Sequence, residues 1–332
     1  MLNVQLFYLY LKYKRTILNQ NKKLHICNKL GESMNYSKTF KKIRIAKGMK
    51  LKEAAGNTLS ISQLSRFENE QSMISIDSFI ELLTNVNTSP EEYFYLLRQE
   101  EENELKNYFN RVKNLVNNKK YDKLEELVID LKNQKPASNS WMSFIVLFVE
   151  SIIVLDKEKK PLNQPRVLSY LIQVEDWGEM ELYIYAIFGF VFDVETTYLL
   201  MKTAIKKSRL YQSIPQDMNL LFSILSNNFS AFLLHKRYDY AEETLAIYEK
   251  KLLENTLLIE PHLDFLFNKG IFAFTQKREE EAKVYCEQVF ELCRLFKLTE
   301  QEENYKKLYL MWSKSYLDPD FQELIIKIGF IS

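Results

Sequence analysis

The chain has 332 residues and a formal net charge of +1, and its 46% hydrophobic and 27% charged residues indicate a folded protein rather than a disordered one. Its length favours two domains. With 7 Gly it carries neither a dinucleotide-binding glycine motif nor a phosphate-binding P-loop. Its 3 His and 3 Cys are too few and too scattered for a catalytic triad, a metal site or a disulfide framework. We therefore expect no enzyme activity and no cofactor, and a reducing cytoplasm as the location.

The first segment, residues 1–33, opens with a short apolar run that no basic region precedes and no cleavage site follows. A signal peptide needs both features, and a membrane span needs about 20 apolar residues. We expect residues 1–33 to be an extension outside the main fold. The residues just before Met34 could be encoded by a purine-rich ribosome-binding sequence, so a native start at Met34 is a hypothesis for mass spectrometry to test.

Positive charge gathers immediately after this extension. Residues 34–66 carry eight Lys or Arg and one acid, whereas the chain beyond residue 98 is net acidic. A local basic cluster on a mildly acidic chain predicts a small module that meets a polyanion.

Five short helices are predicted in residues 34–98. The first four run over about residues 37–47, 51–55, 61–69 and 76–86, and the fifth opens at Ser89-Pro90. Gly48 is expected to end the first helix, and Ser60 with Gln63 forms a capping-box pattern before the third. Apolar residues three or four apart should form one core: Phe40, Ile43, Ala54, Leu59, Leu64, Phe67, Phe79, Leu82 and Leu83.

This core leaves a polar face on the third helix, which suits a helix that enters a DNA major groove. Amides read adenine, arginine reads guanine or grips phosphate, and a helix N-terminus attracts phosphate. Two alternatives stay open, because Gln63 could serve only as a cap and the lysines at 41, 42, 47 and 50 could be merely solvated. The predicted DNA-binding residues are Ser62, Gln63, Ser65, Arg66, Lys47 and Lys50.

The stretch LKEAAGNTLSISQLSRFENEQSMIS resembles the XRE-type helix-turn-helix, and more closely that of the Rgg/GadR/MutR regulators. It has a turn one residue shorter than in phage repressors, followed by S-x-S-Q-L-S-[RK]-F-E-x-x-x-S. The resemblance implies that Glu68 pairs with Arg44 of the first helix in a structural role, and DNA reading is the alternative role for this pair. Asn69 and Glu70 depart from the pattern, since many relatives have a basic residue and Gly there.

The remainder reads as an acidic linker, residues 99–105, and a helical-repeat domain, residues 106–332. Prolines separate long helical stretches, and an internal repeat aligns Asn228 with Asn268 and Ala241 with Ala282. Alanine at that position lets two helices approach closely. The apolar run over residues 141–155 is too short to span a membrane and contains Glu150, which favours a buried helix.

Asn228 and Asn268 permit two interpretations. Each could form a hydrogen bond between helices in the core, or line a concave face and bind the backbone of an extended peptide. Phenylalanines around them would supply apolar pockets in the second case. The predicted peptide-binding residues are Asn228, Asn268, Phe188 and Phe232, with Phe229, Phe265 and Phe272 nearby.

Two further residues, Cys286 and Cys293, lie seven apart on one predicted helix face. Core packing is the favoured interpretation of this pair, and redox sensing is the alternative.

The order of the two domains resembles the Rgg members of the peptide-sensing regulators. The resemblance implies an all-α homodimer that binds operator DNA and is controlled, in quorum sensing, by a short hydrophobic peptide on the concave face of tetratricopeptide-like repeats. RNA polymerase is a further partner left open, and no membrane is expected. The alternative function is a DNA-binding repeat protein that docks a protein partner and senses no peptide.

Overall fold

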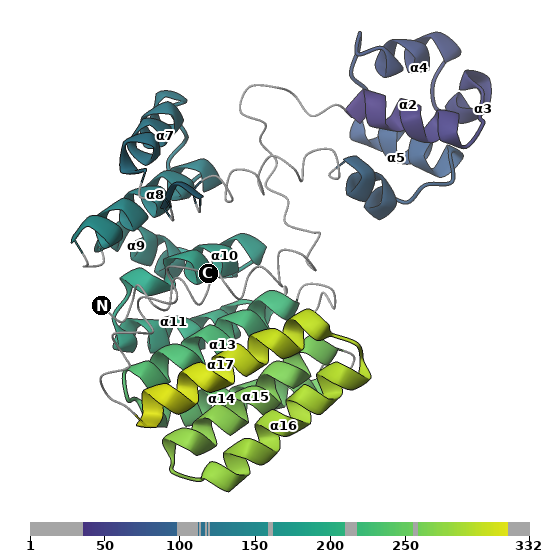
Figure 1. The fold of residues 1–332 in the computed structure, drawn as a ribbon. Coiled ribbons are helices and arrows are strands. Elements are labelled where there is room, and N and C mark those ends of the chain that lie inside the picture. Colours follow the sequence, from purple (N-terminus) through teal and green to yellow (C-terminus); the bar gives the residue numbers. More distant parts are fainter. Residues whose placement is uncertain are drawn as a thin grey trace. The chain divides into compact units, whose positions relative to one another are not determined.

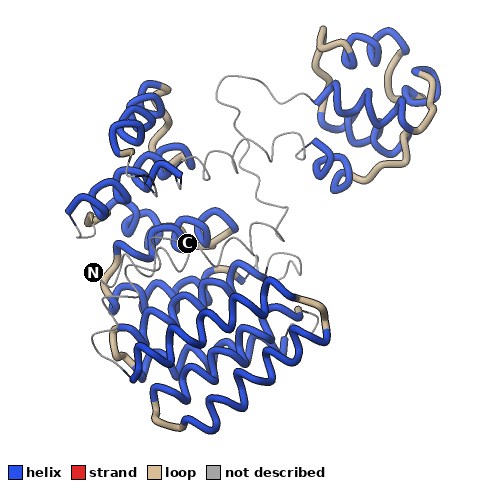
Figure 2. The backbone as a smooth tube through the Cα atoms, in the orientation of Figure 1, coloured by secondary structure: helices blue, strands red, loops and turns tan. Residues whose placement is uncertain are grey.

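The computed structural model describes residues 36–97, 112, 114–116, 118, 120–158, 162–209, 218–254 and 258–317. All regular structure in these residues is helical (Figures 1 and 2), which confirms the predicted all-α class. The chain divides into two compact units, residues 20–114 and residues 115–332 together with 1–19. The predicted extension over residues 1–33 and the predicted linker over residues 99–105 lie outside the described residues.

The N-terminal unit contains the five predicted helices, each within a residue or two of its expected bounds. They are α2 (Tyr36–Ala46), α3 (Leu51–Ala55), α4 (Ile61–Glu68), α5 (Ile76–Asn85) and a helix over residues 90–97. Gly48 ends α2 with a φ of 69°, where L side chains are disfavoured. The Ser60 hydroxyl accepts from the Gln63 N–H at 3.2 Å, and the Gln63 side chain accepts from the Ser60 N–H at 2.9 Å. The predicted capping box is therefore present.

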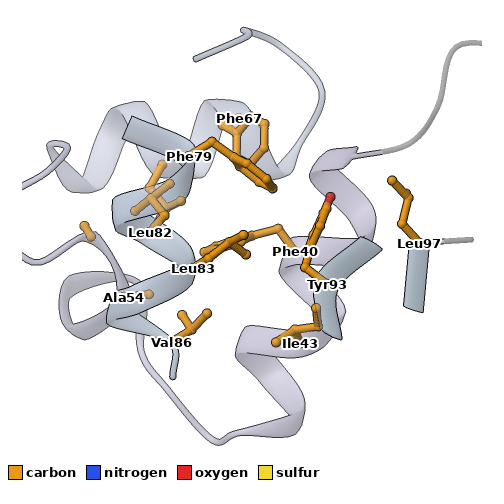
Figure 3. Close-up of a cluster of buried hydrophobic side chains, with 12 residues drawn as sticks. Phe40, Ile43, Ala54, Phe67, Phe79, Leu82, Leu83, Val86, Tyr93 and Leu97 are labelled. Carbon is orange, nitrogen blue, oxygen red and sulfur yellow. The ribbon is translucent and has the colours of Figure 1, made fainter. Parts of the chain in front are cut away.

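One apolar core holds these helices together (Figure 3), and every residue predicted for it is buried except Leu59, which is partly buried. Phe40, Phe67, Phe79 and Tyr93 contact one another with ring centroids 4.8 to 6.4 Å apart. Each fully buried aromatic or aliphatic side chain contributes about 1.5–3 kcal/mol relative to exposure. Tyr93 also donates from its hydroxyl to the carbonyl of Tyr36 at 2.7 Å, which ties the fifth helix to the start of α2.

The second unit is a succession of helical hairpins. Its helices are α7 (Tyr121–Asn133), α8 (Trp141–Glu158), α9 (Pro165–Gln173), α10 (Glu179–Phe188), α11 (Val194–Lys207), α13 (Met218–Leu234), α14 (Tyr238–Glu254), α15 (Ile259–Thr275), α16 (Glu279–Leu295) and α17 (Thr299–Leu317), with a short 3-10 turn at Gly189–Val191. Helix α13 packs on α14 and α15, and α15 packs on α14, α16 and α17. This is the stacked arrangement that the internal repeat predicts.

Close helix approach within the hairpins follows from small residues. Ala241 on α14 and Ala282 on α16 have no exposed surface, as the repeat pattern predicts. Gly270 on α15 is a further such residue, because an added Cβ would lie 2.7 Å from the Cys286 sulfur and 3.1 Å from the Ala282 carbonyl.

The apolar run over residues 141–155 forms part of α8, and most of its side chains are buried within the unit. Glu150 is accommodated by an ion pair with Lys132 of α7 at 2.6 Å. Among the described helices, none is both long and apolar enough to cross a membrane.

Candidate functional sites

Helix α4 presents the polar face that the sequence predicts. Leu64, Phe67 and Glu68 are buried, whereas Ser62, Gln63 and Arg66 are exposed and Ser65 is partly exposed. No side-chain partner of Arg66 is found among the described residues, so its guanidinium is available to a ligand. Contact between this face and DNA stays a prediction.

Gln63 is engaged within its own helix end. Its side-chain oxygen accepts from the Ser60 N–H and also from the Ser60 hydroxyl, both at 2.9 Å. A bidentate contact with adenine needs both the oxygen and the amino group of the amide. While capped, Gln63 offers only its N–H donors, which suits a phosphate or a base acceptor better than adenine.

Arg44 and Glu68 form a buried bidentate ion pair. The Arg44 Nε donates to one Glu68 carboxylate oxygen at 2.5 Å, and a terminal nitrogen donates to the other at 2.8 Å. The remaining terminal nitrogen donates to the Met49 carbonyl at 2.7 Å. The hydrogen bond to Glu68 raises the pKa of Arg44 above its ordinary value. The pair joins α2 to the C-terminal end of α4, so its predicted structural role is confirmed.

The two predicted lysines have different surroundings. Lys50 is exposed, and its ammonium has no partner among the described residues. The Lys47 ammonium donates to the Asn87 carbonyl at 2.5 Å and to the Thr88 hydroxyl at 2.9 Å. Lys47 therefore ties the end of α2 to the turn after α5, and only its remaining N–H is available for a phosphate.

Asn69 and Glu70, which depart from the family pattern, attract two lysines to the end of α4. Lys41 donates to the Asn69 side chain at 2.9 Å, and Lys38 pairs with Glu70 at 3.2 Å. These contacts engage both ammonium groups near the exposed polar face of α4. The departure from the pattern is visible in the sequence, whereas the two lysine partners are not.

The four residues predicted to bind a peptide lie inside the second unit. Asn228 and Asn268 are each 7% exposed, and Phe188 and Phe232 are 0% exposed. The Asn228 amide donates to the Tyr185 hydroxyl at 2.7 Å, and the Asn268 amide donates to the Ser226 hydroxyl at 3.1 Å. The interpretation as hydrogen bonds between helices describes this geometry, and contact with a peptide stays a prediction.

These bonds belong to a series that was not predicted from the sequence. Asn228 joins α13 to α10, Asn268 joins α15 to α13, and Tyr305 of α17 donates to the Asp264 carboxylate of α15 at 2.5 Å. Each bond spans 41 to 43 residues, close to the repeat length. One buried polar bond thus joins the first helix of each hairpin to the first helix of the next hairpin.

A pair of acids lies on α15 within this series. Burial and the neighbouring Asp264 charge raise the pKa of Glu260 to about 7. The spacing of four residues between them places both carboxyl groups on one helix face. Polar residues four apart in an otherwise apolar helix were the available sequence signal.

The two cysteines of α16 are free thiols with no exposed surface. Burial raises the pKa of Cys286 to about 12 and that of Cys293 to about 11. Neither thiol is therefore ionised at neutral pH, and this favours packing over redox sensing. No group of three or more His, Cys, Asp and Glu in the described part of the chain could hold a metal ion.

Comparison with known proteins places these features in context. Residues 161–307 match the family described as the C-terminal domain of the HTH-type transcriptional regulator Rgg. The fold is similar to the SHP pheromone receptor Rgg2 of Streptococcus dysgalactiae, with 19% identity, a TM-score of 0.64, and coverage of 82% of this chain and 98% of that one.

Two further solved structures share the fold. A candidate transcriptional regulator from Listeria monocytogenes EGD-e has 14% identity and a TM-score of 0.70, over 86% of this chain and 99% of that one. Bacillus thuringiensis PlcR in complex with the peptide PapR7 and DNA has 15% identity and a TM-score of 0.52, over 82% and 99%. At these identities the likeness concerns the arrangement of helices.

Proposed function

Because residues 161–307 match the C-terminal domain of the Rgg regulators, we propose that the chain is an Rgg-type transcriptional regulator that binds operator DNA and is controlled by a short hydrophobic signalling peptide. The observation that carries the proposal is the exposed polar face of α4 in one unit, joined in the same chain to a second unit that contains the Rgg match. Among proteins of similar fold, Rgg2 is a pheromone receptor and PlcR was crystallised with a peptide and DNA.

DNA contact is proposed through the first two turns of α4. Ser62 and Ser65 can donate to or accept from base edges or phosphates, and Arg66 can form a bidentate contact with guanine. Lys50 and the remaining donor of Lys47 would grip phosphate, which positions the protein without specifying sequence. Gln63 would contribute an N–H donor beside them.

Peptide contact is proposed along the first helices of the hairpins, α10, α13 and α15. Asn228 and Asn268 keep a small exposed surface, and a side-chain amide can serve a peptide backbone of any sequence. Phe188 and Phe232 have no exposed surface, so their contact with a peptide requires α10 and α13 to rearrange on binding. A ligand that binds the two arrangements unequally would shift the equilibrium between them, as regulation requires.

The assembly is proposed to be a cytoplasmic homodimer, with RNA polymerase as a further contact. A single short recognition helix supplies little affinity, and two-fold operators match a two-fold protein. We propose that the second unit supplies the dimer surface. Sedimentation of the full chain at micromolar concentration tests whether the homodimer forms, and a clean monomer would contradict the proposed assembly.

The DNA proposal is tested by selecting from a pool of random double-stranded DNA with the full-length protein. The most enriched sequence is the selected duplex, and a shuffled version of it is the scrambled duplex. Arg66→Ala should weaken binding of the selected duplex by about 1–3 kcal/mol and leave the scrambled duplex nearly unchanged. Arg66→Lys is the matched control, because it keeps the charge and loses the bidentate geometry. Equal affinity of both variants and the wild type would place recognition elsewhere.

The peptide proposal needs a separate measurement. Synthetic hydrophobic peptides encoded beside the gene are titrated into the full-length protein by calorimetry, with a negative heat-capacity change as the expected sign of apolar burial. Binding of one peptide that changes affinity for the selected duplex supports the proposal. No peptide binding, with capture of a protein partner instead, would favour the alternative function.

A further inference from the structure

The turn between α3 and α4 leads directly into the proposed recognition helix. Helix α3 ends at Ala55 and α4 begins at Ile61, so five residues connect the two helices. A helix of eight residues has few side-by-side contacts to fix its direction. Contacts that hold this turn therefore add to the core packing of Leu64 and Phe67 in setting the orientation of the polar face of α4.

Asn85, the last residue of α5, holds the turn from outside. Its side-chain nitrogen lies 3.1 Å from the Ala54 carbonyl, 3.5 Å from the Ala55 carbonyl and 3.3 Å from the Thr58 hydroxyl. The last carbonyls of a helix have no partner within that helix and need one from elsewhere. One amide therefore satisfies the end of α3 and restrains the turn that follows, across about 30 residues of sequence.

Gly56 makes this arrangement possible. Its φ of 52° with a ψ of −128° is a conformation that residues with a side chain rarely adopt. A Cβ at this position would also lie 2.9 Å from the Asn85 side-chain nitrogen. Glycine is thus required both by the backbone of the turn and by the close approach of the Asn85 amide.

The opposite end of α4 is held by a second tie, the Arg44–Glu68 ion pair. Helix α4 is therefore fixed at its beginning by α5, through the turn, and at its end by α2. The exposed Ser62, Gln63 and Arg66 lie between the two ties. Reading base edges requires each side chain to be placed to within a fraction of an ångström.

We propose that Asn85 is a positioning residue for DNA recognition: it touches no DNA, and it fixes the angle at which α4 meets the bases. This inference rests on the proposed DNA binding. If Asn85 only capped α3, its loss would lower stability and would weaken all DNA binding by the same factor. A positioning role predicts instead that discrimination between sequences falls while binding through phosphates remains.

The experiment measures the affinity of the full chain for the selected and the scrambled duplex, well below the melting temperature. Asn85→Leu removes the donor and keeps a similar size, and Thr58→Ala removes one acceptor if the first variant does not fold. Thr84→Ala is the matched control, because the side chain of this exposed neighbour donates within α5, to the Ile80 carbonyl, and does not contact the turn. Hydrogen exchange of the Thr58 and Leu59 amides, which bond to the Ala55 carbonyl, reports on the turn itself.

We expect Asn85→Leu to lower the ratio of selected to scrambled affinity by about tenfold or more, since misplacing one bidentate contact has an effect of this size. Affinity for the scrambled duplex and its salt dependence should stay within about twofold of the wild type. Exchange at Thr58 and Leu59 should quicken, while Thr84→Ala leaves every value unchanged. An unchanged ratio in Asn85→Leu would overturn this inference and leave the proposed DNA binding standing. If Asn85→Leu does not fold, an unchanged ratio in Thr58→Ala has the same meaning. Failure of the wild type to enrich any duplex would overturn the proposed DNA binding and this inference together.

Discussion

The two units use polar side chains in opposite ways. In the N-terminal unit the polar ties lie at helix ends, as with Arg44–Glu68 and Asn85, and the middle of α4 remains exposed. In the second unit the polar ties of α13 and α15 lie within the helices, and the residues that looked available, Asn228 and Asn268, are already bonded. A polar residue on a helix is therefore a good indicator of a ligand site only where packing leaves that face uncovered.

Helix length explains the difference. Helices α2 to α5 have 5 to 11 residues, whereas α13 to α16 have 17 residues each. A long helix is oriented by ridges and grooves along its sides, and a buried polar bond then sets its register against the next hairpin. A short helix has less side surface for this, so ties at its ends contribute more to its orientation.

The largest expected effect comes from breaking the Arg44–Glu68 ion pair at the end of α4. Arg44→Ala should destabilise the N-terminal unit by about 3–5 kcal/mol, because it leaves the buried Glu68 carboxylate unpaired. Lys38→Ala, which breaks an exposed ion pair with Glu70, is the control and should cost at most about 1 kcal/mol. Urea unfolding of both variants checks this. Equal effects would mean that the buried pair is no more important than a surface contact.

A smaller effect tests the corresponding tie in the second unit. Asn228→Ala should lower stability by about 1–3 kcal/mol, since the buried Tyr185 hydroxyl loses a donor. The adjacent, more exposed Asn227→Ala is the control and should cost less. Thermal melts and peptide titration are measured together on both. Peptide affinity that falls while the melting temperature holds would instead show that Asn228 serves the ligand and not the core.

The acid pair of α15 gives the second unit a pH dependence. The folded pKa of Glu260 is about 7 and its ordinary value is 4.5, so the folded state keeps a proton that the unfolded state releases. The stability from this group is complete below about pH 4.5 and is lost as the pH rises through about 7. Glu260→Gln should therefore be more stable than the wild type at pH 8, on the order of 1–2 kcal/mol, and similar to it at pH 5. Urea unfolding at both pH values measures this difference. A gain in stability that is the same at both pH values would contradict the raised pKa of Glu260.

The smallest expected effect concerns a backbone feature that occurs in both units, a positive φ at a residue other than glycine. Glu70 after α4 and Lys277 after α15 have φ values of 59° and 61°, where side chains are disfavoured. Glu70→Gly and Lys277→Gly should each raise stability by about 0.5–1 kcal/mol, with Glu70→Gly at the lower end because it also loses the pairing with Lys38. Thermal unfolding of the two variants measures this. A loss in either would show that its side chain contributes more than the backbone strain removes.

Local sequence determined most of the N-terminal unit. Apolar residues three or four apart within each helix predict the buried faces that carry Phe40, Phe67 and Leu82. The Ser60–Gln63 cap and the helix end at Gly48 are equally local signals. The close packing at Ala241 and Ala282 follows equally from a repeat visible in the chain. The pairing of Arg44 with Glu68 came from the resemblance to a family, because nothing in the spacing identifies that partner.

Tertiary structure alone decided which polar groups are occupied. The Asn85 amide meets Ala54 at a separation of 31 residues, Lys47 meets Thr88 at 41, and Asn228 meets Tyr185 at 43. The residues that neighbour a donor in the sequence do not indicate which distant acceptor will be brought beside it by helix packing. Helix periodicity gives the face on which a side chain lies, but the partner depends on the register between helices, and that register is fixed only when the whole core has packed.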